Sequence, residues 1–406
     1  MTKLTDLIVF NDRQLAARYA VGKIPMATLL EAYLDGALDI PNMDAFLDSR
    51  KDLVDFTLTK KHFEFFFTRM IPEVAIHSKS QDRRIVREHY DRGDDFFEAF
   101  LGERMVYTSG IFQDDHETVE QAQDNKMDLV CRKLMLKPGQ EMLDIGCGWG
   151  TLALHAAKQY GANSTGITIS KNQTTFGNGR IAKAGLSDRA RLECLDYRDI
   201  PNRQWDRIAS LEMVEHVGVK NLSKYCRLVY DRLKDDGIFL LQWVGLRRGG
   251  DLGVPVIGLR PEDLVWGLFM SKYIFPGADA SIPLSDMAKA LEKAGFQIQS
   301  VENISIHYSD TIRLWHQNWQ KHKEQVLRSY GERWYRLWHL FLGWSWRIAA
   351  QGTGQGFQIV AHKNLDTFDR KMFTRRAAVS PVRHERDARA PALSVNGNGV
   401  HVADAE

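Results

Sequence analysis

The chain has 406 residues, which allows two or three domains at roughly 150 residues each, and 44% of them are apolar, enough to build hydrophobic cores. Lysine and arginine number 54 against 52 aspartates and glutamates, and the formal charge of +2 creates no field typical of nucleic-acid binding. The composition therefore predicts a folded chain without a nucleic acid partner.

Cysteine spacing and hydropathy restrict the compartment and the kind of site. The four cysteines are Cys131, Cys147, Cys194 and Cys226. They show neither CxxC spacing nor clustering with histidine, which disfavours a zinc site and a disulfide scaffold. The sequence starts without a long apolar leader, and no segment reaches the roughly 20 apolar residues that span a bilayer. We therefore expect a cytoplasmic protein with no metal site and with peripheral membrane contact.

Residues 1–80 alternate helical patterns with breaks at proline and glycine, which predicts a helical amino-terminal domain. Within it, residues 56–70 carry several aromatic rings beside Lys60, Lys61 and Arg69. Rings and cations on one segment are typical of a helix that lies on an anionic membrane surface. The alternative is a helix that packs its rings against the rest of the protein.

Between residues 126 and 245, short apolar runs alternate with helical stretches. The runs are 141–145, 163–169, 191–195, 205–211 and 237–242. This alternation predicts an α/β fold, with a parallel sheet that carries helices on both faces. Ligands bind such sheets at the carboxyl ends of the strands, so we expect the functional residues to follow these runs.

Residues from about 246 to 350 are rich in glycine and aromatic residues and end in a predicted helical hairpin. Six tryptophans lie in the hairpin: Trp315, Trp319, Trp334, Trp338, Trp344 and Trp346. So many indoles indicate a core or the wall of an apolar cavity, with core packing as the default for each ring. We predict a helical cap over an apolar channel.

The remaining residues, 365–406, form a predicted carboxyl-terminal extension. Hydrophobic periodicity is lost from Phe373 onward, and the sequence becomes first arginine-rich and then small and polar. This composition predicts disorder over most of the extension. Its basic half is interpreted as solvated, with contact to anionic lipid as the alternative.

The strongest local pattern is Leu143-Asp-Ile-Gly-Cys-Gly-Trp-Gly, in which a strand ends at Asp144 and opens into glycines before a helix. Without Cβ atoms, Gly146, Gly148 and Gly150 allow a ligand to approach the backbone closely. The spacing is GxGxG and not the GxGxxG of dinucleotide-binding folds. The pattern resembles motif I of class I S-adenosylmethionine-dependent methyltransferases, which implies a Rossmann-like fold and S-adenosylmethionine as methyl donor.

Polar residues follow the next two predicted strands in the order that a nucleoside requires. Thr168 and Gln173 supply a hydroxyl and an amide where a ribose would lie. Asp196 and Tyr197 offer a carboxylate and a ring that suit the amine and the face of adenine. Ordinary loop polarity is the alternative for either pair taken alone.

Seven segments together resemble the cyclopropane-fatty-acyl-phospholipid synthase family. In the order that the family shows, between about residues 80 and 364, they begin at His89, Met105, Leu143, Asp196, Glu215, Lys272 and His307. Segments 211–218 and 267–281 are most similar to the sphingolipid C9-methyltransferases of fungi. The resemblance implies a methyltransferase domain over residues 81–364 that includes the cap and acts on an unsaturated lipid.

Such a reaction, as the resemblance implies it, joins the donor's methyl group to a double-bond carbon and leaves a carbocation that must lose a proton. The enzyme must align the reactants, exclude water and supply a base. Family members hold a bicarbonate as that base. On this chain the contacts of the anion map to Ser109, Glu215, Gln242, the backbone of Val244, and Tyr308. Serine and glutamine replace the family's cysteine and histidine but still hydrogen-bond anions, so both retention and loss of bicarbonate stay open.

Neighbouring residues complete the predicted site. By the same resemblance, Tyr107, Thr108 and Ser109 close over the amino acid end of the donor, with core packing as the alternative for Tyr107. His216 is grouped with Glu215 as catalytic, against the alternative of an ion pair at a helix start. The altered base site favours proton loss from a chain carbon, which gives a methyl-branched olefin, over proton loss from the new methyl, which closes a cyclopropane.

We therefore expect an enzyme that adds a methyl or methylene carbon to the double bond of an unsaturated membrane lipid. The alternatives are a sphingolipid C9-methyltransferase, a cyclopropane synthase acting on phospholipid acyl chains, and a lipid-binding protein without catalysis. The aromatic cap disfavours a methyltransferase for small polar acceptors. The sequence is also compatible with a homo-oligomer.

Overall fold

The computed structural model describes residues 3–70, 93–247, 260–278 and 282–374. By the contacts within them, the residues divide into two compact units, Met1–Asp369 and Arg370–Glu406. Of the second unit, the described part forms the 3-10 helix η7 (Arg370–Phe373).

The carboxyl-terminal extension is predicted over residues 365–406, and the structure describes its first part, up to residue 374. Phe368 is 5% exposed in the first unit, and its ring stacks on His362 with centroids 3.8 Å apart. This contact holds the chain after the last strand. The remainder, which the sequence predicts to be disordered, lies almost entirely outside the described residues.

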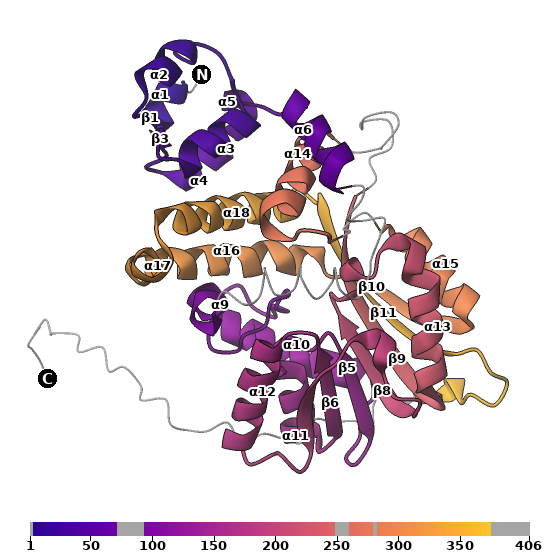
Figure 1. Cartoon of the computed structure of the whole chain (residues 1–406). Coiled ribbons are helices and arrows are strands. Elements are labelled where there is room, and N and C mark those ends of the chain that lie inside the picture. Colours follow the sequence, from indigo (N-terminus) through magenta and orange to yellow (C-terminus); the bar gives the residue numbers. More distant parts are fainter. Residues whose placement is uncertain (1–2, 71–92, 248–259, 279–281, 375–406) are drawn as a thin grey trace, which may run out of the picture. The chain divides into compact units, whose positions relative to one another are not determined.

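A seven-stranded sheet forms the centre of the first unit, in the order β10-β11-β9-β8-β5-β6-β7 (Figure 1). The strands are β5 (Glu141–Ile145), β6 (Asn163–Thr168), β7 (Ala190–Cys194), β8 (Trp205–Leu211), β9 (Leu233–Leu246), β10 (Phe296–Asn303) and β11 (Gly354–Lys363). The five strands from β5 to β9 run parallel, as predicted. Two further strands were not predicted: β11 pairs antiparallel with β9, and β10 pairs antiparallel with β11.

Helices cover both faces of this sheet, which confirms the α/β class (Figure 1). One face carries α10 (Val119–Lys133), α11 (Thr151–Tyr160) and α12 (Lys171–Lys183), and the other carries α13 (Leu222–Arg232) and α15 (Leu284–Ala294). Short 3-10 helices η2 (Tyr197–Asp199), η3 (Val214–His216) and η4 (Val219–Asn221) follow the strands. Because the sheet is covered on both sides, residues 238–243 of β9 are fully buried. Gln242 is the polar exception in that run.

The predicted helical hairpin and an aromatic core form the cap. Its helices are α9 (Asp94–Leu101), α14 (Pro261–Phe269), the π-helix η6 (Met270–Ile274), α16 (Ser305–Lys321), α17 (Lys323–Tyr330) and α18 (Glu332–Ala350). The ring of Phe96 lies 5.1 Å from Trp319, 4.9 Å from Trp338 and 4.8 Å from Tyr330. Trp319 and Trp338 are fully buried, so these indoles pack in a core. Aromatic pairs of this kind add about 0.5–1.5 kcal/mol beyond the burial of their area.

Two elements inside the range predicted as cap belong to the sheet layer instead. α15 packs against α13, and β10 pairs with β11. The cap helices therefore come from three stretches of sequence: α9 before the sheet, α14 and η6 before α15, and α16 to α18 after β10.

The amino-terminal segment contains short helices and, unlike the prediction, two small ladders. The helices are α1 (Leu4–Leu7), α2 (Arg13–Arg18), α3 (Met26–Leu34), α4 (Met43–Asp48), α5 (Arg50–Leu53), α6 (Lys60–Phe65) and the π-helix η1 (Phe66–Met70); the strands are β1 (Val9–Phe10), β2 (Ile24–Pro25), β3 (Leu38–Asp39) and β4 (Val54–Asp55). β1 pairs with β3 and β2 with β4. The apolar side chains of this segment share one hydrophobic cluster with the cap. It is therefore packed as part of the cap core.

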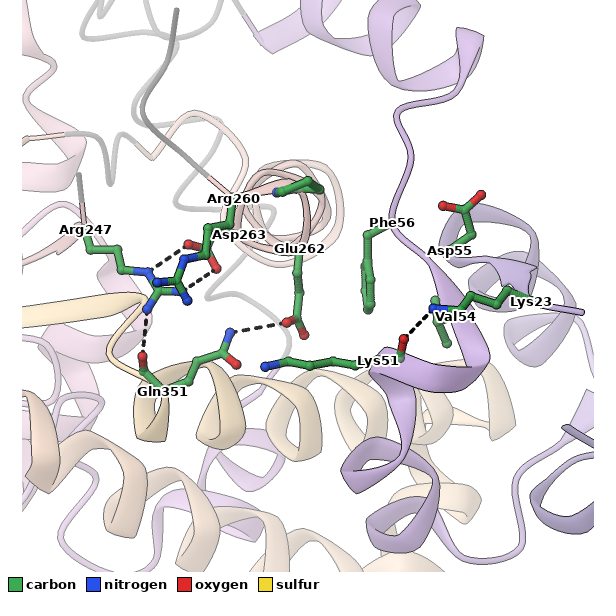
Figure 2. Close-up of a pocket in the computed structure, with 11 residues that line it drawn as sticks. Lys23, Lys51, Val54, Asp55, Phe56, Arg247, Arg260, Glu262, Asp263 and Gln351 are labelled. Carbon is green, nitrogen blue, oxygen red and sulfur yellow. Dashed lines mark hydrogen bonds and ion pairs between the residues drawn. The ribbon is translucent and has the colours of Figure 1, made fainter. Parts of the chain in front are cut away.

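Two buried arginines join the amino-terminal segment to the cap. Arg347 of α18 donates from Nε to Asp48 Oδ1 at 2.6 Å. Arg50 donates from Nε to Glu262 Oε1 at 2.5 Å, and Trp344 Nε1 donates to the same oxygen at 3.2 Å. Figure 2 shows Glu262 of α14 beside the amino-terminal segment. These pairs fix the orientation of the segment on α14 and α18.

We expect Arg50→Met to lower the free energy of unfolding by about 3–5 kcal/mol, because it leaves the buried Glu262 carboxylate without its counter-charge. Arg50 and Glu262 are 6% and 9% exposed. Urea unfolding of the full chain measures the loss. The matched control is Arg13→Met on the surface, for which a change within about 0.5 kcal/mol is expected. Equal stability of the two variants would show that the Arg50 pair does not hold the segment.

The segment predicted to meet a membrane forms α6 and η1. Phe63 and Phe67 are 49% and 63% exposed there. No helix in the part of the chain that the structure describes is both long and apolar enough to cross a membrane.

Candidate functional site

The predicted glycine turn links β5 to α11. Asp144 lies in β5, and Gly146, Gly148 and Gly150 follow with positive φ angles of 81°, 53° and 80°. A Cβ added at Gly146 would lie 2.6 Å from the Cβ of Met213, so the turn requires glycine there. At Gly148 no atom lies within 4 Å of such a Cβ. Gly148 therefore borders open space, as a ligand that contacts the backbone requires.

Asp144 is a buried carboxylate with an open hydrogen-bonding position. It is 2% exposed, and its Oδ1 has no hydrogen-bond partner among the described residues. Burial raises the pKa of Asp144 to about 7, although the charge of Lys126 lowers it. A buried carboxylate oxygen without a hydrogen-bond partner lowers the stability of the folded state. The position therefore fits a ligand with a cationic N–H donor, such as the ammonium group of S-adenosylmethionine.

Lys126 of α10 supplies the positive charge of this region, and the sequence prediction missed it. It is fully buried, and its Nζ donates to Thr108 Oγ1 at 2.6 Å. Burial lowers the pKa of Lys126 to about 8, while the charges of Glu212 and Asp144 raise it. Lysine on a polar helix is ordinarily solvent-exposed, so nothing in the local sequence distinguishes Lys126.

Glu212, which directly follows β8, is the second functional candidate that the sequence prediction missed. Its carboxylate accepts hydrogen bonds from Thr108 Oγ1 and, at 2.5 Å, from Gln242 Nε2. Burial raises the pKa of Glu212, while Lys126 and the two hydrogen bonds lower it. The available signal was its place at the carboxyl end of a central strand, where ligands bind.

Gln242 of β9 is held in one orientation by a chain of amides. Its Oε1 accepts from Gln358 Nε2 at 2.8 Å, and Gln358 Oε1 accepts from Lys133 Nζ at 2.5 Å. The Nε2 of Gln242 is therefore directed toward Thr108 Oγ1, at 2.8 Å, and Glu212. Gln242 acts as a hydrogen-bond donor to the site.

The other predicted base-site residues come from η3, β9, α16 and the segment before α10. Glu215 Oε1 accepts from Val244 N at 2.7 Å. The hydroxyl of Tyr308 lies 3.4 Å from Thr108 Oγ1. Ser109 is fully buried, and its Oγ has no hydrogen-bond partner within the described ranges. These contacts link Glu215 to Val244 and Tyr308 to Thr108.

His216 follows Glu215 in η3, and its backbone N–H donates to Met213 O at 3.0 Å. This bond fixes the short turn that carries Glu215. A catalytic role of the imidazole stays a prediction.

The predicted nucleoside contacts are partly satisfied within the chain. Thr168 Oγ1 donates to Gln173 Oε1 at 2.8 Å. Both oxygens of Asp196 accept from Arg198, each at 2.7 Å, and Arg198 lies 5.1 Å from the centre of the Tyr197 ring. The prediction missed Arg198. Its guanidinium neutralises the carboxylate that was expected to meet an adenine amine.

Aromatic rings form the wall beside these polar groups. The ring of Tyr107 lies 5.4 Å from Phe100, 5.7 Å from Trp315 and 5.6 Å from Phe275. These rings come from α9, α16 and the end of η6. Tyr107 thus joins the cap core to Thr108 and its polar network.

Asp94 at the start of α9 ties this wall to the glycine turn. It accepts from Trp149 Nε1 at 2.7 Å and from Asn172 Nδ2 at 2.9 Å. Trp149 lies in the turn itself, and Asn172 lies in α12. The aromatic wall and the glycine turn are therefore held together by direct hydrogen bonds.

A cavity of about 310 Å³ lies between the amino-terminal segment and α14 (Figure 2). Its lining is mostly charged and contains no predicted site residue. Arg247 donates to both oxygens of Asp263, at 2.9 and 3.1 Å. This cavity is a salt-bridged junction and differs from the apolar channel that the sequence predicts.

Sequence comparison identifies a matching family and several relatives of the chain. A family profile described as mycolic acid cyclopropane synthetase matches residues 77–359. Sphingolipid C9-methyltransferase of Komagataella phaffii is 47% identical over 394 residues, which cover 93% of this chain and 78% of that protein. Sphingolipid C9-methyltransferase 2 of Gibberella zeae is 47% identical over 361 residues, 87% of this chain and 68% of that protein. A probable fatty acid methyltransferase of Pseudomonas putida is 32% identical over 341 residues, 80% of this chain and 84% of that protein.

Solved structures agree with these matches. Mycolic acid cyclopropane synthase CmaA1, solved with SAH and CTAB, has a TM-score of 0.66 at 27% identity, covering 71% of this chain and 100% of that one. Cyclopropane synthase MmaA2 of Mycobacterium tuberculosis has a TM-score of 0.65 at 28% identity, covering 69% and 98%. The predicted Rossmann-like class I methyltransferase fold is confirmed.

Proposed function

The chain belongs to the mycolic acid cyclopropane synthetase family, and we propose on this premise that it methylates a double-bond carbon of an unsaturated lipid chain. It is an S-adenosylmethionine-dependent methyltransferase, in which the donor supplies an activated methyl group on a sulfonium. The observation that carries the lipid assignment is the pairing of a buried polar network at Thr108 with the aromatic wall at Tyr107. A weak apolar nucleophile needs such a wall, whereas a polar acceptor does not.

We assign the donor to the glycine turn and the strand ends beside it. Gly148 leaves room for close backbone approach, and Asp144 offers its open oxygen to the ammonium group. Thr168 and Gln173 are assigned to the ribose, and Asp196 with Tyr197 to the adenine. Holding the donor against the lipid converts a bimolecular step into a nearly unimolecular one, which is a large part of catalysis.

The aromatic wall excludes water from the reacting carbon. A carbocation exposed to solvent would add water and give an alcohol. Exclusion of water therefore determines the product. Tyr107 and its neighbouring rings also present negative faces, each worth about 0.5–2 kcal/mol to a nearby cation. Ser109, Glu215, Gln242, Tyr308 and His216 are assigned to the region where the proton leaves.

We propose a sphingolipid as the lipid, since the relatives at 47% identity are sphingolipid C9-methyltransferases. A fatty acyl chain is the second candidate, supported by the fatty acid methyltransferase at 32% identity. The test is lipid mass spectrometry of a host that expresses the chain and receives methyl-labelled methionine with defined olefinic lipids of both classes. One labelled carbon is expected on the sphingoid chain. Label on acyl chains alone would replace the first candidate by the second, and no label on either class would refute the function.

The product type needs a second measurement, because a cyclopropane and a methyl-branched olefin both gain one carbon. Mild hydrogenation saturates the olefin and leaves the ring intact. We expect the labelled lipid to take up hydrogen at the methylated position. An unreactive product would identify cyclopropane formation.

We also assign α6 and η1 to peripheral membrane contact, because Phe63 and Phe67 are exposed beside Lys60. Inserting a phenylalanine into an apolar phase contributes about 1.5–3 kcal/mol. Replacing both rings by serine is therefore expected to weaken sedimentation with anionic vesicles about tenfold or more. The control is Ile306→Ser, an equally exposed site on α16 at 63%. Unchanged vesicle binding of the double variant would remove this assignment.

A further inference from the structure

Two glutamates of this chain occupy donors that the family resemblance assigns to an external anion. Val244 N–H donates to Glu215, and the amide of Gln242 donates to Glu212. An anion taken from solvent would have to displace one of these carboxylates. Glu215 belongs to the contacts that the resemblance assigns to the anion, but Glu212 does not. The chain thus places the Glu212 carboxylate where the resemblance expects bicarbonate to meet Gln242.

Glu212 lies beside the glycine turn that we assign to the donor. It follows β8, which pairs with β5, the strand that leads into the glycine turn. The next residue, Met213, is the one that a Cβ at Gly146 would strike. Thr108, which donates to Glu212, is also 3.4 Å from the hydroxyl of Tyr308. Glu212 therefore lies between the donor turn and the predicted base-site residues.

The surroundings of Glu212 suit a base. Burial raises the pKa of its carboxyl above the ordinary value, which makes the carboxylate a stronger proton acceptor than one in water. The charge of Lys126 opposes this rise and keeps the ionised form accessible. Hydrogen bonds from Thr108 and Gln242 hold the carboxylate in position before reaction.

The backbone conformation of Glu212 is unusual, which supports a functional role for this residue. Its φ of 57° lies in the left-handed region, which glutamate rarely adopts. Such a conformation is strained for a residue that carries a Cβ, and strained residues concentrate at functional sites. Glu212 N donates to Gln242 O at 2.8 Å, which helps to maintain this conformation.

We propose that the Glu212 carboxylate is the base of this reaction, an assignment that rests on the proposed methylation of an olefin. The π pair of the double bond forms the new bond to the methyl carbon, while the carbon–sulfur bond breaks and its electron pair stays on sulfur. Glu212 then accepts a proton from a carbon adjacent to the cationic centre. The C–H electron pair forms the new double bond, and the protonated Glu212 returns its proton to water when product leaves.

Glu212→Gln removes the base and keeps the shape and hydrogen-bond acceptor of the side chain. We expect methyl transfer to fall about 100-fold or more, within the range for loss of a general base. Binding of S-adenosylhomocysteine by calorimetry is expected to stay near the wild-type value, without a lower melting temperature. Glu324→Gln on the exposed surface of α17 is the matched control.

Glu212→Gly separates a base from a merely structural residue. Glycine adopts the left-handed conformation without strain and leaves room for a small anion. We expect added formate or bicarbonate to raise the activity of this variant about tenfold, as general-base catalysis by the restored carboxylate predicts. The wild-type enzyme is expected to turn over equally fast with and without bicarbonate.

Three results would contradict the assignment. Full activity of Glu212→Gln, with a wild-type enzyme that needs bicarbonate, would make the solvent anion the base and leave the proposed function intact. Loss of S-adenosylhomocysteine binding in Glu212→Gln would assign Glu212 to the donor site. A wild-type enzyme that methylates no olefinic lipid would overturn both the function and the role of Glu212.

Discussion

Asp144→Asn is expected to weaken binding of the methyl donor about 100-fold, because loss of one partner of a buried charge pair costs about 2–5 kcal/mol. The carboxylate is 2% exposed and keeps one oxygen without a partner in the described part of the chain. Asparagine fills the same volume but cannot neutralise an ammonium group. The substitution also leaves Lys126 with one counter-charge fewer.

The same carboxylate makes donor binding depend on pH. The pKa of Asp144 is raised to about 7, so its charge is lost as the pH falls below that value. We therefore expect donor affinity to rise between about pH 6 and pH 7.5 in the wild-type enzyme, and to vary less in Asp144→Asn. In the absence of donor, the free energy of unfolding depends on pH in the opposite direction from donor affinity. The folded state binds a proton that the unfolded state has released, so this group destabilises the protein as pH rises from 3.8 to about 7.

Calorimetric titration with S-adenosylhomocysteine at several pH values measures the loss of affinity in Asp144→Asn and the pH dependence of binding. Asp115→Asn in an exposed loop is the control, and it is expected to bind the donor product like the wild type. Asp144→Asn that binds within about threefold of the wild type, a difference near 0.7 kcal/mol, would exclude Asp144 from the donor site.

The sequence was sufficient to predict the parallel sheet and the glycine turn, because both depend on local patterns. Strands buried on two faces tend to be near-continuous apolar runs, and a turn with φ near 80° requires glycine. The antiparallel strands β10 and β11 were missed. Their pairing joins residues 296–303 to 354–363 across the whole α16–α18 hairpin, and no local signal reports such a long connection.

The polar network was harder to predict for a related reason. Lys126 and Glu212 can be identified as site residues only from the fold, in which α10 and β8 bring them to the same Thr108 hydroxyl. Lys126 alone looks like an ordinary surface charge, and the sequence marks Glu212 only by its place at the carboxyl end of β8. The pairing of Asp196 with Arg198 is local, with a separation of two residues, but an acidic residue beside an arginine is too common to indicate a buried ion pair.

Glu215→Gln is expected to lower the rate of methyl transfer about 100- to 1000-fold and to leave donor binding intact. Glutamine Oε1 still accepts the Val244 N–H that Glu215 accepts at 2.7 Å, so the turn around η3 keeps its geometry. What disappears is one negative charge, which we propose to lie beside the carbon that becomes cationic. Loss of one fixed electrostatic contact to a transition state typically costs about 10²–10³ in rate.

The comparison with Glu212→Gln separates the two carboxylates. If Glu215 stabilises the cation and Glu212 removes its proton, both act on the same cationic intermediate, and the double variant should lose less than the product of the single losses. Formate should then raise the activity of Glu212→Gly and leave that of Glu215→Gln unchanged. Single-turnover rates of the single and double variants measure these losses, with Glu292→Gln as the surface control. Wild-type rates in Glu215→Gln would show that its charge contributes nothing to the reaction, and Glu215 would then serve only to hold Val244.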